Sequence, residues 1–213
     1  MVCPPFGMNI FLDFDGTLID VSERYYRVHE AALGATKPQL TRDEYWQLKR
    51  RHISEADILR QYYADVDVQN YAQERGTFIE CPRFLRYDRL LPQAVPVLEM
   101  LNQARHRLYL LTLRRNEHNL RAEVDSLGLG PYFRLILTAS SDAPPWEVKA
   151  ALLRPHAQPA DWIVGDTEAD IRAGQMLGLH TCAVASGIRT EELLRSANPE
   201  RSLPSIEKLP LLL

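Results

Sequence analysis

The alternation of apolar runs and amphipathic segments along the chain predicts a layered α/β fold. Short, nearly continuous apolar runs are typical of strands buried on both faces of a parallel sheet. Such runs occupy residues 8–14, 108–113, 135–139, 162–164 and 181–185. Helical patterns with capping residues lie between them, at residues 96–104, 116–127, 167–177 and 190–197. Strands that alternate with helices in this way form a parallel sheet with right-handed crossovers, so we expect a doubly wound, Rossmann-like core.

One long interval interrupts this alternation. Residues 20–89 contain no convincing strand, and helical patterns begin there at Ser22, Thr41, Ser54 and Val68. A structureless segment of that length is implausible inside a compact domain. We therefore expect an all-α domain at residues 20–89, inserted after the first strand, and an α/β core formed by residues 1–19 and 90–213.

Composition excludes several classes of protein. The 213 residues are 46% hydrophobic and 25% charged, which is ordinary for a globular chain and argues against disorder. A formal net charge of −3 gives no support to binding of nucleic acid or of an anionic membrane. The three cysteines lie too far apart in the sequence for a zinc site, and we find neither a signal peptide nor a membrane-spanning run. We expect a soluble, cytoplasmic protein.

The strongest motif is Asp13-Phe14-Asp15-Gly16-Thr17, at the end of the first predicted strand. Ligands of open α/β sheets bind at the carboxyl ends of the strands. Two carboxylates at positions i and i+2 point to one side and repel each other unless a cation lies nearby. Such oxygen ligands suit Mg²⁺, and a carboxylate beside Mg²⁺ can attack phosphorus. An ordinary turn after a strand would also place Asp and Gly here.

A second acidic pair follows the strand at residues 162–164. Asp166 lies at the strand end, and Asp170 lies four residues later, on the same face of the next helix. Both carboxylates can therefore lean toward one cation. The alternative is a helix-capping Asp with a solvated acid behind it.

Two further residues complete an ordered set. Thr112 ends the strand at 108–113, where a hydroxyl and backbone N–H groups can hold phosphate oxygens. Lys149 is the one lysine between the Thr112 and Asp166 segments, and its compact ammonium suits a site of carboxylates and phosphate. Taken singly, the first could be a plain strand residue and the second a solvated helix lysine. Four such signals at successive strand ends favour a functional site.

This ordered set resembles the haloacid dehalogenase-like hydrolase superfamily, in its phosphoglycolate phosphatase-like branch with a helical cap. The resemblance runs from the motif at residues 11–18 to a closing pattern at residues 206–210, and residues 20–89 match the cap. It implies a Mg²⁺-dependent phosphatase that hydrolyses a small phosphorylated metabolite through an aspartyl-phosphate. A mobile cap would exclude water and restrict access to small substrates.

The resemblance also implies a role for each motif residue. Asp13 would attack the phosphate, and Asp15 would protonate the leaving alcohol and then activate water. Thr112 and Lys149 would bind the transferring phosphoryl group. Mg²⁺ would be held by Asp13, the backbone carbonyl of Asp15 and Asp166, with Asp170 nearby. The substrate would be bound by Gly16, Thr17, Leu113 and Arg114.

Two features concern substrate choice and fit to the family. The basic cluster that contains Arg50 and Arg51 lies where related proteins keep a specificity loop. We hypothesise that Arg50 or Arg51 grips a carboxylate or second phosphate of the substrate, although cations also favour solvated helix ends. Lys149 departs from the usual pattern, because no proline follows it and it lies only 17 positions before Asp166.

Other functions stay open at this stage. A sugar phosphomutase of the same branch would pass the phosphoryl group to a sugar instead of water. A non-catalytic, phospho-accepting regulatory protein could also combine strand-end acids with Thr and Lys, but such proteins need neither a helical insertion nor a leaving-group acid. Phosphoglycolate, a sugar phosphate and a nucleotide monophosphate are all candidate substrates. We expect a monomer or a weak homodimer.

Overall fold

A computed structural model describes residues 7–213 and contains a six-stranded parallel sheet. The strands are β1 (Asn9–Leu12), β4 (Arg107–Thr112), β5 (Leu135–Thr138), β6 (Trp162–Gly165), β7 (His180–Val184) and β8 (Arg201–Leu203). Their order is β5-β4-β1-β6-β7-β8, so β1 lies between β4 and β6. The chain first extends the sheet from β1 toward β5 and then crosses to β6. This switch point brings the ends of β1, β4 and β6 together, which is where open α/β sheets bind ligands.

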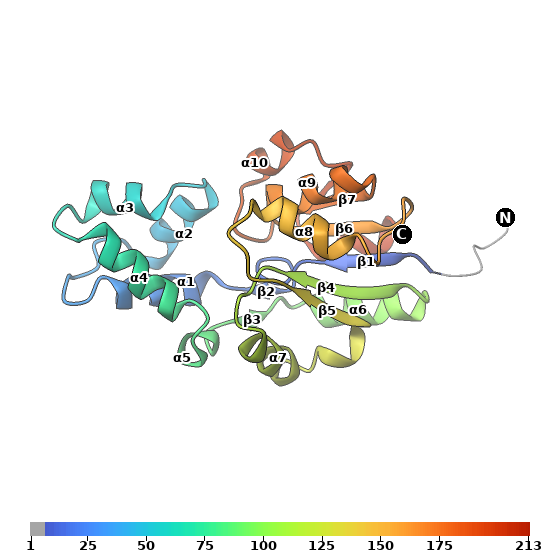
Figure 1. The fold of residues 1–213 in the computed structure, drawn as a ribbon, viewed down its shortest axis with the longest axis horizontal. Coiled ribbons are helices and arrows are strands. Elements are labelled where there is room, and N and C mark those ends of the chain that lie inside the picture. The colour runs from blue at the N-terminus through green and yellow to red at the C-terminus, as the bar shows by residue number, and fades with distance from the viewer. Residues whose placement is uncertain (1–6) are drawn as a thin grey trace.

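Helices cover both faces of the sheet (Figure 1). They are α6 (Ala94–Gln103), α7 (Glu117–Ser126), α8 (Pro145–Leu153), α9 (Glu168–Leu177) and α10 (Glu191–Ser196), with short 3₁₀ helices at Gly130–Tyr132 and Ile206–Leu211. Successive residues of β1 point to opposite faces. Ile10 and Leu12 pack with α6 and α7, whereas Phe11 packs with α8 and α9. The predicted doubly wound α/β fold is confirmed.

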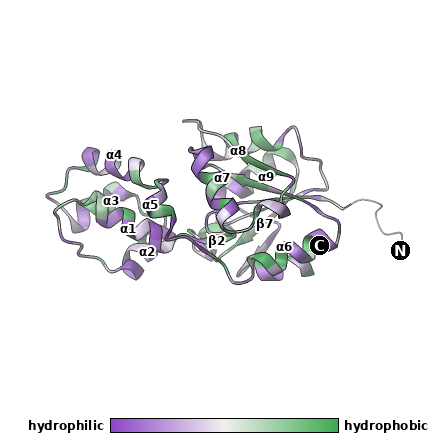
Figure 2. Ribbon diagram, turned by 90° about the horizontal axis from the view of Figure 1, so that it is seen from below, coloured by the Kyte–Doolittle hydropathy of each residue, from purple (hydrophilic) through white to green (hydrophobic). Residues whose placement is uncertain are grey.

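Five helices separate β1 from β4 in the sequence. They are α1 (Ser22–Ala32), α2 (Arg42–Arg50), α3 (Glu55–Tyr62), α4 (Val68–Phe78) and α5 (Pro82–Leu85). Thr41 and Ser54 cap α2 and α3 by accepting a backbone N–H three residues later. This helical insertion has its own apolar cluster, built around Tyr45, Ile58 and Leu59. Two views at right angles place it beyond the carboxyl ends of the strands (Figures 1 and 2).

A short ribbon connects the insertion to the sheet. Its strands β2 (Ile19–Asp20) and β3 (Arg89–Leu90) pair antiparallel, and the sequence pattern did not predict them. The sequence also missed α5, α8 and β8, and it began α6 at Pro96 instead of Ala94. Proline is tolerated in the first turn of a helix, because its missing N–H has no partner there. Within residues 7–213, every helix is too short or too polar to cross a membrane.

Candidate active site

The loop after β1 fixes Asp13 against the neighbouring strand. The Asp13 N–H donates to the Val164 carbonyl oxygen on β6 at 2.9 Å, and Gly16 N–H closes the loop onto Ile19 O at 2.8 Å. Gly16 adopts a positive φ of 81°, and a Cβ at this position would lie only 2.1 Å from Asp166 Oδ2. Both observations require glycine. The loop therefore lies directly against the acid of the second motif.

Lys149 reaches Asp13 from the second turn of α8. Its Nζ lies 2.7 Å from Asp13 Oδ1 and also donates to Asp170 Oδ1. All three side chains are buried. Burial alone would lower the pKa of Lys149, but the carboxylates of Asp13 and Asp170 raise it above its ordinary value. The site thus holds a buried ammonium between two carboxylates despite the unusual spacing of this lysine.

Three carboxylates form a candidate metal centre. Oxygens of Asp13, Asp166 and Asp170 all lie within 4.8 Å of one another. Asp170 Oδ2 accepts the N–H and O–H of Thr167, and Asp166 Oδ2 accepts the Ile188 N–H at 2.6 Å. In the part of the chain that the structure describes, the buried Asp166 Oδ1 has no hydrogen-bond partner.

Electrostatics around Asp166 favour a bound cation. Burial raises the pKa of Asp166, and the neighbouring carboxylates of Asp13 and Asp170 raise it further. A fully buried carboxylate with a free oxygen, flanked by two more acids, fits the oxygen ligands that Mg²⁺ prefers. The residues present therefore suit the metal that the sequence predicts.

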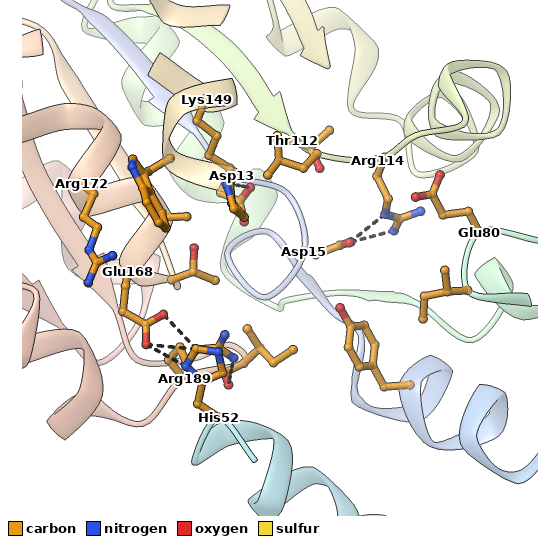
Figure 3. Close-up of a pocket in the computed structure, with 18 of the residues that line it drawn as sticks. Asp13, Asp15, His52, Glu80, Thr112, Arg114, Lys149, Glu168, Arg172 and Arg189 are labelled. Carbon is orange, nitrogen blue, oxygen red and sulfur yellow. Dashed lines mark hydrogen bonds and ion pairs between the residues drawn. The ribbon is translucent and has the colours of Figure 1, made fainter. Parts of the chain in front are cut away.

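Asp15 points toward Arg114 (Figure 3), and it also pairs with Arg24. Arg114, which follows β4, donates from Nε and Nη2 to the two Asp15 oxygens at 2.7 Å each, and Arg24 Nη2 on α1 lies 3.0 Å from Asp15 Oδ2. Burial acts to raise the pKa of Asp15, but the two guanidinium groups hold it well below its ordinary value. The sequence assigned Arg114 to substrate binding and missed Arg24.

These groups line a cavity of about 610 Å³ between the insertion and the sheet. Thr112 and Leu113, for which the sequence predicts substrate contacts, line this cavity. Asp13 and Lys149 lie beside Thr112 (Figure 3). The insertion contributes Arg24, Tyr25, His52, Ile79 and Glu80. On the sheet side the cavity also meets Trp146, whose ring lies 5.0 Å from the Arg172 guanidinium. A phosphate ester entering here would meet a lysine, a hydroxyl and two acids together.

The structure does not bring Arg50, Arg51 or Thr17 to the surface of this cavity. Arg50 Nη2 instead donates to the carbonyl oxygens of Ala185 at 2.8 Å and Arg189 at 3.3 Å. Arg51 is exposed, and Thr17 is fully buried beneath the loop. Arg50 therefore joins α2 to the loop after β7, and the neighbouring His52 reaches the cavity in its place.

The family model for haloacid dehalogenase-like hydrolases matches residues 10–184. The chain belongs to this family. A comparison of this HAD-like hydrolase with curated proteins finds no match. Its membership confirms the resemblance that the motifs at Asp13 and Asp166 indicate.

Solved structures share the fold across almost the whole chain. A candidate phosphatase from Clostridium difficile has a TM-score of 0.81 and 16% identity, covering 98% of this chain and 99% of its own. A predicted phosphoglycolate phosphatase from Haemophilus somnus has a TM-score of 0.74 and 16% identity, covering 97% of each chain. The hydrolase YfnB from Bacillus subtilis, bound to magnesium, has a TM-score of 0.66 and 19% identity, covering 97% of this chain and 98% of its own. At sequence identities this low, the similarity shows that the fold is shared.

Proposed function

We propose that this HAD-like hydrolase is a Mg²⁺-dependent phosphatase of small phosphorylated metabolites that acts through an aspartyl-phosphate on Asp13. The observation that supports it most is the pairing of Asp13 with Lys149 at 2.7 Å, beside two further buried acids and at the wall of the cavity. In phosphoryl transfer the protein mainly positions groups and neutralises charge. Asp13 and Lys149 supply the nucleophile and the positive charge.

The proposed reaction has two displacements at phosphorus. In the first, a carboxylate oxygen of Asp13 attacks phosphorus and the ester P–O bond breaks. The departing oxygen takes a proton from Asp15, which can gain that proton only on release from the arginines that keep it ionised. In the second, Asp15 takes a proton from water as the water oxygen attacks the same phosphorus. The bond from phosphorus to Asp13 then breaks, and inorganic phosphate leaves. Lys149 and Thr112 hold the phosphoryl oxygens in both steps.

The acidic cluster supports a metal-dependent reaction. Asp13, the backbone carbonyl of Asp15 and Asp166 would hold Mg²⁺, with Asp170 nearby. When bound, the ion would offset the negative charge of the phosphoryl oxygens. The free oxygen of Asp166 supports this assignment, as does the magnesium bound to the structurally similar YfnB.

The cavity supports a small substrate, because about 610 Å³ lies within the usual range for small-molecule sites. Residues 20–89 would act as the cap, since Tyr25, His52 and Ile79 from this insertion face the reacting groups across the cavity. A phosphoric monoester of a small metabolite, such as phosphoglycolate or a sugar phosphate, fits this enclosure.

A panel of phosphate esters tests the proposal. Purified protein with Mg²⁺ is screened for phosphate release, beside an EDTA control, Asp13→Asn and the matched control Asp142→Asn, whose side chain is fully exposed. We expect EDTA to abolish turnover and Asp13→Asn to lower kcat to below about one-thousandth, while Asp142→Asn keeps the wild-type rate. Inactivity across the whole panel, or normal turnover by Asp13→Asn, would refute the proposal.

A further inference from the structure

Most of the cationic side chains in the cavity wall are already paired with acids. Those that form such ion pairs are Arg24, Arg114, Lys149 and Arg189. Arg172 on α9 also lines the cavity and is exposed. Within residues 7–213 its guanidinium forms no ion pair, and it lies over the Trp146 ring instead, 5.0 Å from the centroid. In the described part of the chain, Arg172 is therefore the arginine of this wall whose charge is available to a ligand.

The stack on Trp146 orients Arg172 without using its donors. A guanidinium over an aromatic ring is held through its flat face, so the N–H groups along its edge stay free. Such an edge matches two oxygens of a carboxylate or a phosphate. The half-buried Trp146 packs against the apolar cluster around Phe11, which fixes the ring to the sheet domain. The pair therefore presents free donors from a supported platform.

The helices that carry this pair also carry the groups beside the reacting atoms. Trp146 lies three residues before Lys149, on the same side of α8, and Arg172 lies two residues after Asp170 on α9. Helices α8 and α9 pack side by side (Figure 1). The spacing between Arg172 and Lys149 is therefore set within the sheet domain and does not depend on where the insertion lies.

Two acids of the cavity wall do not compete for Arg172. Glu168, on the same helix, is paired with Arg189 at 2.9 Å. Glu80 accepts two backbone N–H groups, and it lies on the opposite side of Asp13 from Arg172 (Figure 3). The charge of Arg172 is thus left for an oxyanion that enters the cavity.

We propose that Arg172, stacked on Trp146, binds a second oxyanion of the substrate while Lys149 holds the transferred phosphoryl group. The second oxyanion is a carboxylate or a second phosphate. This inference rests on the proposed function and narrows its substrates to phosphate monoesters that carry another negative group. The selecting charge then belongs to the sheet domain, whereas the sequence suggested Arg50 or Arg51 of the insertion.

The experiment compares three phenyl phosphates that differ in the para substituent, which is a carboxylate, a second phosphate or the uncharged carboxamide. The variants are Arg172→Gln and Arg172→Lys. Arg154→Gln is the matched control, because Arg154 is an exposed arginine at the end of α8, outside the cavity wall. For each ester, kcat/KM of a variant is divided by that of the wild type, which removes the effect of leaving-group acidity.

We expect Arg172→Gln to lower kcat/KM at least about tenfold on one or both charged esters and less than about twofold on the carboxamide. The loss should lie mainly in KM, because the second oxyanion is remote from the reacting atoms. Arg172→Lys should recover part of the loss, and Arg154→Gln should match the wild type. An equal effect on charged and uncharged esters, or the same selective loss in Arg154→Gln, would overturn the inference.

A binding measurement separates this inference from the proposed function. Calorimetry on Asp13→Asn, with and without Arg172→Gln, gives the dissociation constants of the three esters without turnover. Tighter binding of a charged ester than of the carboxamide, abolished by Arg172→Gln, would support the inference even if phosphate release fails and the proposed function with it. Equal binding of all three esters would overturn the inference even in an active phosphatase.

Discussion

At the scale of single residues, the site is built from acids that oppose folding. Asp166 is fully buried, and one of its oxygens has no hydrogen-bond partner within residues 7–213. Burial of a charge without a partner is costly, and the raised pKa of Asp166 reflects this cost and the nearby carboxylates. A buried charge that is needed for activity lowers the stability of the folded protein. Neutralising Asp166 should therefore stabilise the fold while removing a metal ligand.

Asp166→Asn is predicted to unfold at a higher temperature than the wild type in EDTA, because the amide carries no charge. Mg²⁺ at about 100 times its dissociation constant should stabilise the wild type by about 2.7 kcal/mol and leave Asp166→Asn unchanged. Thermal unfolding with and without Mg²⁺ measures both effects. A magnesium shift of normal size in the variant would contradict the assignment of Asp166 as a ligand.

The sequence reveals the acids of the site and Arg114, but neither the pairing of Arg114 with Asp15 nor the presence of Arg24. Asp13 and Asp166 could be found because strand ends converge at one edge of a parallel sheet, and Lys149 because it is the one lysine between the Thr112 and Asp166 segments. Arg24 belongs to no motif, and its contact with Asp15 depends on how the insertion packs against the sheet domain. The one available signal was its position on α1, where it shares the buried stripe of Val28 and Ala32. An arginine on an apolar stripe indicates a buried partner.

At the scale of elements, the helical insertion is organised around a neutral histidine. His29 on α1 is fully buried, and its ring nitrogens lie 2.7 Å from the Tyr71 hydroxyl and 3.3 Å from the Tyr63 hydroxyl. Its ring also stacks on Tyr45, with centroids 4.3 Å apart. Burial lowers the pKa of His29 to about 4, although Glu55 acts in the opposite direction. The helices α1, α2, α3 and α4 thus share one polar centre that cannot easily accept a proton.

This pKa predicts that the protein loses stability in mild acid. The unfolded chain binds a proton at His29 below about pH 6.5, while the folded chain stays neutral until about pH 4. At about pH 5 the His29 contribution to the free energy of unfolding should be about 2 kcal/mol smaller than at neutral pH. Urea unfolding at both pH values should show this difference reduced in His29→Gln and retained in the exposed control His118→Gln. If the free energy of unfolding depended on pH identically in the wild type, His29→Gln and His118→Gln, the prediction would be contradicted.

The elements that the sequence predicts are those with a clear period or a cap. Thr41, Ser54 and Asn116 each accept the backbone N–H expected of an N-cap, so α2, α3 and α7 begin where the pattern places them. The ribbon strands β2 and β3 have two residues each, which is too short for any period. Their pairing depends on the insertion returning to its starting point, a tertiary property that local patterns do not encode.

At the scale of the whole molecule, Glu80 and Arg50 join the insertion to the main chain of the sheet domain. Glu80, which follows α4, accepts the backbone N–H of Arg115 at 2.9 Å and of Asn116 at 2.7 Å, at the start of α7. Arg50 donates to carbonyl oxygens after β7, as described above, and its own carbonyl accepts the Thr190 N–H at 3.1 Å. Each contact engages main-chain groups of the sheet domain. Such contacts leave no pattern in the sequence, so the placement of the insertion could not be predicted.

Glu80→Ala is predicted to loosen the insertion, because it removes two charge-assisted hydrogen bonds at a helix N-terminus. Hydrogen exchange of the Arg115 and Asn116 amides should accelerate by about tenfold or more, while amides of the central strand β1 stay unchanged. Glu191→Ala on the exposed start of α10 serves as the control, since among residues 7–213 Glu191 pairs only with the exposed Arg195. Unaltered exchange at both amides would show that Glu80 does not hold the insertion.

The account depends above all on phosphate becoming bonded to Asp13. Reduction with borohydride during turnover of an aryl phosphate converts an aspartyl-phosphate to homoserine, and peptide mass spectrometry locates the change. We predict homoserine at position 13 when substrate and Mg²⁺ are both present, and none when either is omitted or in Asp13→Asn. Modification at a different residue, or an unmodified Asp13 in a protein that releases phosphate under the same conditions, would contradict the account.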